Sequence, residues 1–402
     1  MNKSMRIKNA TVWNGGEVLE TFANLCIADG RFINESELAP DATVIDATGL
    51  VILPGLINAH VHFCLDGTAE SVARLIAEPK VTTAYKAYAA AEATLRSGTT
   101  TVRDVGCNGG IGIFLKKAIE EGVVNGPRMM ASGPCIVMTG GHNRFIGTEV
   151  DGVEEARKAA RKNLKMGADL IKVVSTGGVI TPMVEPEHVQ LSMEEMRAAV
   201  DEAHNCGKLA SSHAQGEQGI RNSLKAGVNT IEHGIYLTPD LIEQMLKYRA
   251  ALVPTLTPMR RILNAGPDAG IPGYAVEKMR RVAGYWVESF CAAAEAGVPI
   301  VAGTDAGTPG NPHGSVAVEV KFMVEAGLSP VLALRSATTA AAAAIGMADQ
   351  VGKIEAGLWA DIIFIKGDPL KDIQALDNLC GVMKGGEFVW FDRDNKAERP
   401  AA

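Results

Sequence analysis

The middle of the chain alternates short apolar stretches with longer stretches in which apolar residues recur at helical spacing. The short stretches predict buried β-strands, and the longer ones predict amphipathic helices. One predicted helix, residues 192–207, opens with the capping-box pair Ser192 and Glu195 and closes on Gly207, a residue type that often ends helices. The predicted strands are residues 56–63, 99–106, 128–137, 170–176, 208–214, 229–237, 251–257 and 299–307.

Strands and helices that alternate at this spacing predict a parallel sheet, because parallel neighbours need a helical crossover. Eight such units predict an α/β fold, a closed (β/α)8 TIM-like barrel over residues 57–349. A doubly wound open sheet is the structural alternative. It is the weaker hypothesis because no G-x-G-x-x-G motif follows the first predicted strand.

The two ends of the chain show a different pattern, in which apolar and polar residues alternate between turn signals. The turns are Asn-Gly, Asp-Gly and Gly near the N-terminus, and Gly-Asp-Pro and Gly-Gly near the C-terminus. These signals predict short strands joined by tight turns. We therefore expect residues 1–56 and 350–402 to form one small β-sandwich domain built from both termini.

The predicted strand at residues 170–176, LIKVVST, carries a lysine among apolar residues. A lone ammonium group in a buried strand is unfavourable unless it is paired or neutralised. Lys172 therefore needs either a carboxylate partner inside the barrel or a chemical role.

Metal-ligand residue types occur at the ends of other predicted strands. His60 and His62 form an H-x-H motif, and side chains two apart on a strand point to the same face, about 6–7 Å apart. His213, His233 and Asp305 end later strands, so in a barrel they would share the same C-terminal mouth. Each residue alone has a plainer explanation, such as a satisfied polar side chain or a turn former. The ordered set, with a lysine among them, favours a metal site.

That set resembles the amidohydrolase superfamily of metal-dependent hydrolases over nearly the whole chain. The motifs that carry the resemblance are PGLINAHVH, SGTTTVRDVG, SSHA, IEHG, AGTDAG and GKIEAGLWADIIFI. The resemblance implies two divalent metal ions at the barrel mouth. The implied ligands are His60 and His62 for one ion, His213 and His233 for the other, Lys172 as a bridge, and Asp305, which also handles the proton.

The implied bridge explains the buried lysine. A neutral amine can add CO2 and become an anionic carbamate, and burial lowers a lysine pKa and so favours the neutral amine. The two carbamate oxygens of Lys172 would then bridge two cations about 3.5–4 Å apart. Imidazole and carboxylate ligands suit Zn2+, while manganese and iron stay open.

Two further motifs, GGHNRF and HGIYL, resemble the branch with imidazolonepropionase-like proteins, Xaa-Pro dipeptidases (prolidases) and Arg/Lys carboxypeptidases. KVVSTGGVITP matches the peptidases, which keep the bridging lysine, whereas imidazolonepropionase has a mononuclear site without it. His142 resembles a histidine of the peptidases that holds the scissile carbonyl or its oxyanion. Tyr236 resembles a tyrosine of the peptidases that binds the tetrahedral centre. The plainer explanations are a loop-stabilising histidine and a tyrosine packed at the barrel rim.

The predicted reaction is hydrolysis of small-molecule substrates, Xaa-Pro dipeptides or N-acyl-prolines. Met183 and Val184, close to the strand end, favour proline, whereas Glu185 and Glu187 further out keep a carboxypeptidase for C-terminal Arg or Lys open. An imidazolonepropionase-like cyclic amidohydrolase and a metal-free binding or scaffold barrel also stay open, whereas Lys172 argues against a deaminase of the same superfamily. Candidates for a carboxylate-binding cation are Arg144, Arg260 and Arg261, and His313 is a candidate to line the pocket.

Composition narrows the classes of partner and compartment. The net charge of −7, with no cluster of Lys and Arg, argues against nucleic acid or an anionic membrane as partner. The seven cysteines are scattered and include no C-x-x-C pair, which is typical of free thiols in a reducing compartment. The N-terminus has no apolar signal region, and no apolar run reaches the roughly 20 residues of a membrane helix. We expect a cytoplasmic protein, and a homo-oligomer because such barrels commonly self-associate.

Overall fold

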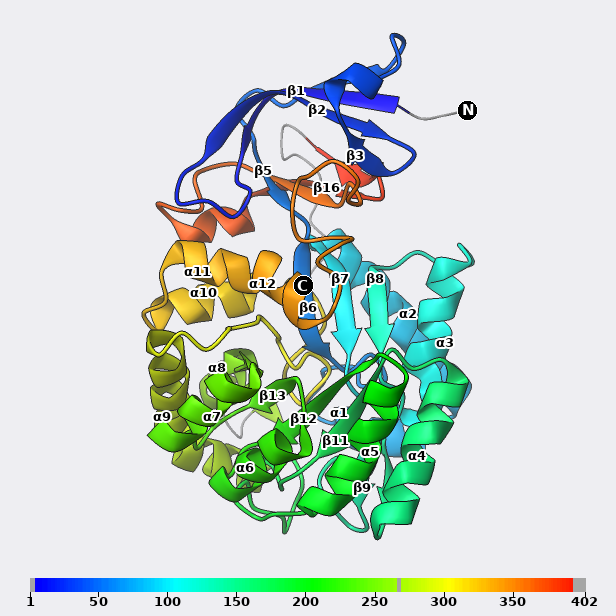
Figure 1. Cartoon of the computed structure of the whole chain (residues 1–402), viewed down its shortest axis with the longest axis vertical. Coiled ribbons are helices and arrows are strands. Elements are labelled where there is room, and N and C mark those ends of the chain that lie inside the picture. The colour runs from blue at the N-terminus through cyan, green and yellow to red at the C-terminus, as the bar shows by residue number, and fades with distance from the viewer. Residues whose placement is uncertain (1–3, 266–268, 393–402) are drawn as a thin grey trace. The chain divides into compact units, whose positions relative to one another are not determined.

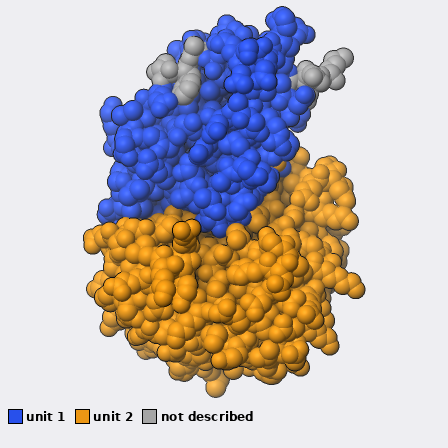
Figure 2. Space-filling view, in the orientation of Figure 1, with its two compact units in different colours: residues 1–58, 92–101, 314–402 blue, residues 59–91, 102–313 orange. Residues whose placement is uncertain are grey.

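The computed structural model describes residues 4–265 and 269–392. The chain divides into two compact units, which Figure 2 colours separately. One unit comprises Met1–Asn58, Glu92–Thr101 and Gly314–Ala402, and the other comprises Ala59–Ala91 and Val102–His313. Within the described residues, no helix has the length and apolar character needed to cross a membrane.

The two ends of the chain share one sheet, as the turn signals predict. β1 (Ser4–Val12) pairs antiparallel with β2 (Glu20–Ala28) and parallel with β4 (Thr43–Asp46) and β5 (Val51–Pro54). β15 (Ile362–Ile365) pairs antiparallel with β5, so C-terminal strands continue the N-terminal sheet. The strand order is β17-β16-β15-β5-β1-β2-β3, with β4 beside β1. The remaining strands are β3 (Arg31–Ile33), β16 (Leu379–Lys384) and β17 (Glu387–Phe391).

The middle of the chain forms the predicted barrel (Figure 1). Six strands follow the order β10-β9-β11-β12-β13-β14 and three follow the order β6-β7-β8. Parallel bridges from Ile300 to Leu252 and from Ala306 to Val61 place residues 300–306 between β14 and β6. The strands are β6 (Leu56–Val61), β7 (Thr99–Asp104), β8 (Arg128–Ala131), β9 (Cys135–Met138), β10 (Gly147–Val150), β11 (Leu170–Val174), β12 (Leu209–Ala214), β13 (Thr230–His233) and β14 (Ala251–Val253).

Helices follow the strands, and α4, α5 and α6 pack one beside the next over β11 and β12 (Figure 1). The predicted capping box of α5 is confirmed, because the Ser192 side chain accepts a hydrogen bond from the Glu195 backbone N–H. The helices are α1 (Ser71–Ala77), α2 (Lys80–Arg96), α3 (Ile111–Glu120), α4 (Val153–Met166), α5 (Met193–Asn205), α6 (Glu217–Ala226), α7 (Pro239–Tyr248), α8 (Leu256–Ala265), α9 (Gly273–Glu295), α10 (Ala317–Glu325), α11 (Pro330–Ser336) and α12 (Thr339–Ala344).

Three predicted strands are shorter or more broken than the sequence pattern indicates. The strand at 251–257 ends at Val253, because Thr255 has a left-handed φ of 49° and α8 begins at Leu256. The strand at 128–137 splits into β8 and β9 around Gly133, whose φ is 71°. The strand at 299–307 forms only isolated bridges. Each of these irregularities occurs where the chain turns at or near the barrel mouth.

Candidate metal centre and active site

Five histidines from four segments of the chain form a continuous row, four at the ends of barrel strands and His142 in the segment between β9 and β10. The ring centroids of His62 and His60 are 5.2 Å apart, and those of His60 and His233 are also 5.2 Å apart. The row continues from His233 to His213 and from His213 to His142, at 4.5 Å in each case. All five side chains are buried. Parallel barrel strands end on one rim, which is why residues so far apart in the chain meet.

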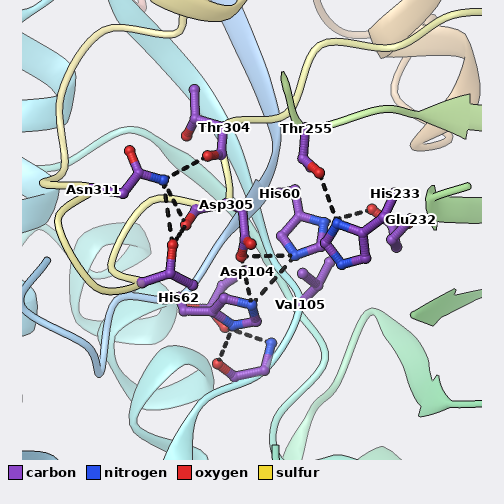
Figure 3. A network of polar contacts seen from close by, with 12 residues as sticks. His60, His62, Asp104, Val105, Glu232, His233, Thr255, Thr304, Asp305 and Asn311 are labelled. Carbon is purple, nitrogen blue, oxygen red and sulfur yellow. Dashed lines mark hydrogen bonds and ion pairs between the residues drawn. The ribbon is translucent and has the colours of Figure 1, made fainter. Parts of the chain in front are cut away.

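His60, His62 and Asp305 form the tightest part of this row. His60 Nε2 and His62 Nε2 are 3.3 Å apart. Asp305 Oδ1 lies 3.4 Å from the first nitrogen and 3.3 Å from the second (Figure 3). Two imidazole nitrogens and a carboxylate oxygen are a donor set that suits a divalent transition metal. The cluster can therefore hold a metal ion, and its potential ligand atoms all lie within 4.8 Å of one another.

The second nitrogen of each of these histidines is fixed by the protein. His60 Nδ1 donates to Glu232 Oε2 at 2.7 Å, and His62 Nδ1 donates to the Gly106 carbonyl oxygen at 2.8 Å. With Nδ1 held in this way, Nε2 of each ring faces Asp305 (Figure 3) and is the atom available to a metal ion. Partners of this kind set the tautomer and orientation of metal-binding histidines.

Two residues of the site have left-handed backbones, with φ of 74° at His233 and 54° at Asp305. This conformation is unfavourable by roughly 1–2 kcal/mol for a residue with a side chain. Successive strand residues normally point to opposite faces, yet Glu232 and His233 both face His60. The turn at His233 makes this possible. At Asp305, the Asn311 amide supports the turn by donating to the Asp305 carbonyl oxygen at 2.9 Å (Figure 3).

Glu232 joins His60 to a buried cation. Arg103 Nη2 donates to Glu232 Oε1 at 2.8 Å, and Arg103 Nε donates to the Ala59 carbonyl oxygen at 2.7 Å. Burial by itself would raise the pKa of Glu232, but Arg103 and Lys172 outweigh it and lower the pKa. Glu232 therefore stays an anion that can hold the His60 ring.

Glu232 and Arg103 are not among the site residues predicted from the sequence. Both nevertheless carry the signal that Lys172 carries, a charged residue within an otherwise apolar strand. Glu232 lies in NTIEHG and Arg103 in TTTVRDVG, and each strand is buried at these positions. The same reasoning, applied to every predicted strand, would have selected them.

Lys172, on β11, is 1% exposed. Its Nζ has no hydrogen-bond partner, and no carboxylate of the described residues lies within ion-pair distance of it. Burial lowers the pKa of this amine, an effect that nearby Glu232 opposes but does not overcome. Buried polar groups are nearly always hydrogen-bonded, so an amine of this kind indicates a group that completes it. A direct lysine–carboxylate ion pair, the plainer explanation, is not present.

The remaining histidines of the row are neutral. His213 Nε2 donates to the Gly177 carbonyl oxygen at 2.9 Å, and burial, together with nearby Lys172, lowers the His213 pKa to about 3. Burial also holds the pKa of His142 well below its ordinary value. His142 Nδ1 lies 2.7 Å from Thr181 Oγ1, which fixes the ring.

A glycine is required beside His142. A Cβ added at Gly178 would come within 2.5 Å of the His142 ring. The glycine pair in the KVVSTGGVITP motif thus lets the segment after β11 approach the histidine row closely. On the opposite side, burial lowers the pKa of His233 well below its ordinary value, and the Thr255 hydroxyl holds His233 Nδ1 at 2.7 Å.

A cavity of about 30 Å³ opens onto this row and is called here the catalytic cavity. Its walls combine the polar cluster with apolar side chains, so a bound group would contact side chains of both kinds. The polar lining includes His62, His142, His213, His233 and Asp305, and the apolar lining includes Val179, Ile180, Pro258, Ile262, Met279 and Trp286.

Tyr236 and His313 are not among the described residues that line the catalytic cavity. The Tyr236 hydroxyl donates to Glu187 Oε1 at 2.7 Å, and burial together with this bond raises the Tyr236 pKa to about 12. His313 Nε2 donates to the Leu65 carbonyl oxygen at 2.8 Å. Leu65 does line the cavity, so His313 supports a wall from behind.

Comparison with known proteins gives a consistent result. The sequence profile of the amidohydrolase family matches residues 51–389. Ochratoxinase of Aspergillus niger is 30% identical over 370 residues, which cover 84% of this chain and 75% of the relative. A solved Xaa-Pro dipeptidase with methionine bound in its active site is 31% identical, with a TM-score of 0.88 over 96% of this chain and 99% of that one.

A solved prolidase in complex with N-methylphosphonate-L-proline is 30% identical, with a TM-score of 0.88 over 97% of this chain and 100% of that one. Both solved structures match this chain along almost its whole length, and the family profile spans the strands that carry the histidine row and Asp305. This chain therefore belongs to the amidohydrolase family and is a hydrolase.

Proposed function

We propose that this hydrolase is a binuclear, zinc-dependent peptidase that releases proline from Xaa-Pro dipeptides or N-acyl-prolines. The observation that carries the proposal is the buried, unpartnered amine of Lys172, which shares the barrel with the His60–His62–Asp305 cluster. A mononuclear member of the family would have no use for such an amine.

The chemistry of the donor set fits two ions. His60, His62 and Asp305 would hold one, and the neutral rings of His213 and His233 would hold the other. The Lys172 amine would attack CO2 and release one proton, which gives an anionic carbamate with two oxygens. When bound, the ions supply Lewis acidity that polarises the substrate carbonyl and lowers the pKa of the attacking water.

Asp305 is placed to move the proton. Burial would raise its pKa, but the adjacent His60 and His62 outweigh burial and hold the pKa well below its ordinary value. Asp305 is therefore ionised at neutral pH and can accept a proton from the attacking water. It then delivers that proton to the leaving nitrogen as the carbon–nitrogen bond breaks and the new carbon–oxygen bond is complete.

His142 is placed to stabilise negative charge on the substrate oxygen. If the Thr181 hydroxyl donates to His142 Nδ1, the proton of the neutral ring lies on Nε2 and is available to the catalytic cavity. An N–H aimed at a developing oxyanion accelerates acyl transfer. Tyr236 would assist once its hydroxyl leaves Glu187 for the substrate.

The surroundings of Glu185 and Glu187 favour proline over Arg or Lys as the released residue. Arg281 Nη2 lies 2.7 Å from Glu185 Oε2 and 3.3 Å from Glu187 Oε2, and Glu187 also accepts the Tyr236 hydroxyl. Carboxylates already paired with a cation of the chain offer little attraction to a cationic substrate.

The apolar character of the cavity supports the same choice, although its source differs from the sequence prediction. Met183 is 97% exposed and does not line the cavity, because the chain turns outward there with a φ of 62°. The apolar walls come instead from Val179 and Ile180 after β11 and from α8 and α9. A pyrrolidine ring suits such walls.

The experiment is a substrate panel with zinc-loaded protein, combined with metal analysis. Xaa-Pro, Xaa-Arg and Xaa-Lys dipeptides and N-acetyl-proline are compared by release of the C-terminal amino acid. We expect proline release and about two zinc ions per chain. Cleavage of Xaa-Arg without Xaa-Pro would establish the carboxypeptidase hypothesis. Absence of both metal and turnover after zinc supplementation would favour a metal-free binding barrel.

A further inference from the structure

A second and larger pocket, called here the side pocket, lies beside the catalytic cavity. Its volume is about 450 Å³, against about 30 Å³ for the catalytic cavity. Its walls are mainly apolar and include Val72 and Ile76 of α1, Phe145, Pro182 and Tyr274. Mainly apolar pockets of this size commonly bind the apolar part of a ligand.

The two spaces share walls. Ile180 lines both of them. Thr308 lines the catalytic cavity, and the next residue, Pro309, lines the side pocket. Thr181 lines the side pocket while its hydroxyl contacts His142 Nδ1 at 2.7 Å. A substrate whose carbonyl lies at the histidine row can therefore extend one of its ends into the side pocket.

We propose that the side pocket binds the acyl side of the scissile amide and selects bulky, apolar, uncharged acyl groups over the free amino terminus of a dipeptide. This inference rests on the proposed amide-hydrolase function. Thr181 links the side pocket to His142, the residue proposed to hold the substrate oxygen, so the side pocket lies nearest the carbonyl side of the scissile bond.

Charge supports the choice of an uncharged acyl group. Arg144, an exposed residue, lines the side pocket; its guanidinium lies 3.5 Å from the Gly141 carbonyl oxygen, and no acidic side chain of the described residues pairs with it. An unpaired guanidinium disfavours an α-ammonium group nearby. Arg260 and Arg261, the other cations considered from the sequence, line neither space.

The acidic residue of the side pocket does not offset this effect. Glu70 is 71% exposed in its side chain, and its carboxylate lies 3.9 Å from the Arg74 guanidinium. Among the described residues that line the two spaces, the remaining carboxylate is Asp305, which belongs to the metal cluster. An α-ammonium group would thus find no buried carboxylate of its own.

The charge argument is tested with a matched substrate pair, 4-methylpentanoyl-L-proline and Leu-Pro, which differ only in the α-ammonium group. Wild-type, zinc-loaded enzyme is expected to prefer the uncharged compound by at least about tenfold in kcat/KM. Arg144→Glu should lower that preference by at least about tenfold, with Arg144→Gln between the two.

The size argument is tested with N-octanoyl-L-proline and N-acetyl-L-proline. The octanoyl compound is expected to react at least about tenfold faster in kcat/KM, because its methylenes are buried in the side pocket. Ala73→Trp, at an exposed α1 position that lines the pocket, should lower this ratio by at least about tenfold. The matched control is Ala84→Trp, at an exposed position on α2 that lines neither space, and it should leave the ratio unchanged.

The outcomes separate this inference from the function on which it rests. If the enzyme hydrolyses these compounds but shows no preference in either pair, or if Arg144→Glu and Ala73→Trp leave both ratios unchanged, the assignment of the side pocket is wrong and the proposed function stands. If zinc-loaded enzyme hydrolyses none of the four compounds, the proposed function itself is contradicted, and the inference falls with it.

Discussion

The two sides of the barrel rim differ in how their buried polar atoms are satisfied. On one side His60, Glu232 and Arg103 form a continuous chain of hydrogen bonds, so every charge has a partner. On the other side, on β11, Lys172 is equally buried and its amine has no partner. The first side is satisfied by protein atoms as far as His60 Nε2, which faces Asp305 in the metal cluster. The second is complete only when another group joins it.

The two sides therefore offset the free-energy cost of burying a charged side chain in different ways. The Arg103–Glu232 pair remains charged because each ion neutralises the other and hydrogen bonds satisfy the remaining atoms. Lys172 instead has a lowered pKa, which favours an uncharged amine that is chemically reactive. A carbamate would restore charge only where metal ions are present to balance it.

The largest effect is expected from Lys172→Ala, which removes the buried amine that has no partner. We expect kcat/KM to fall by at least about 100-fold and bound zinc to fall from about two ions to about one. Propionate should restore part of the activity, because its two oxygens can replace those of the carbamate. The barrel should still fold, with a moderate loss of thermal stability, because loss of the buried lysine stem leaves a cavity although the amine itself makes no hydrogen bond. Wild-type turnover in this variant would exclude the two-metal hypothesis.

Glu232→Gln removes the anion between His60 and Arg103. Loss of the anion behind His60 should weaken zinc binding by about 10–100-fold in chelator competition. It also leaves Arg103 buried without a counter-charge, which should lower the free energy of unfolding by about 3–5 kcal/mol. Adding Arg103→Met removes the uncompensated charge and should recover stability but not zinc affinity. Unchanged zinc affinity in both variants would show that Glu232 does not position His60.

A smaller effect is expected from Thr181→Val, which removes the hydroxyl beside His142 while keeping the shape of the side chain. If that hydroxyl sets the His142 tautomer, kcat should fall by about tenfold with little change in KM or zinc content. Thr181→Ser keeps the hydroxyl and serves as the control. Equal losses in the serine and valine variants would show that packing, rather than the hydrogen bond, matters at this position.

The smallest effect is expected at a partly exposed ion-pair cluster in which Glu202 accepts hydrogen bonds from Arg157 and Arg161. Arg161 donates to Glu202, and this bond lowers the Glu202 pKa. A carboxylate with a lowered folded-state pKa stabilises the fold at neutral pH, and that contribution is lost as the pH falls through the folded-state value. Glu202→Gln should therefore cost at most about 1 kcal/mol in urea unfolding at about pH 7, and this cost should shrink as the pH falls through the folded-state pKa of Glu202. Activity should not change, and a large loss would reveal coupling between α5 and the site.

Much of the fold was readable from the sequence because it depends on local pattern. The apolar stretch at 170–176 and the capping box at Ser192 can each be recognised from a few consecutive residues. The structure contains both, as β11 and as the start of α5. The strand-end positions of His60, His62, His213, His233 and Asp305 follow from the same pattern once a barrel is assumed. The breaks at Gly133 and Thr255 adjoin Pro134 and Pro254, breaker signals that the strand prediction passed over, while the left-handed φ values at these positions were not predicted.

By itself, then, the sequence determined which residue types reach the barrel rim, and it identified Lys172 as a buried group in need of explanation. Only the tertiary structure decided which side chains these residues contact. Glu232 meets His60 across 172 positions of sequence, and Glu187 is taken by Tyr236 instead of facing a substrate. The physical reason is that a hydrogen bond depends on the orientation of its donor and acceptor. The hydrophobic pattern fixes which face of an element is buried. The side-chain orientations and backbone turns that align a hydrogen bond exist only after the strands have closed into a barrel.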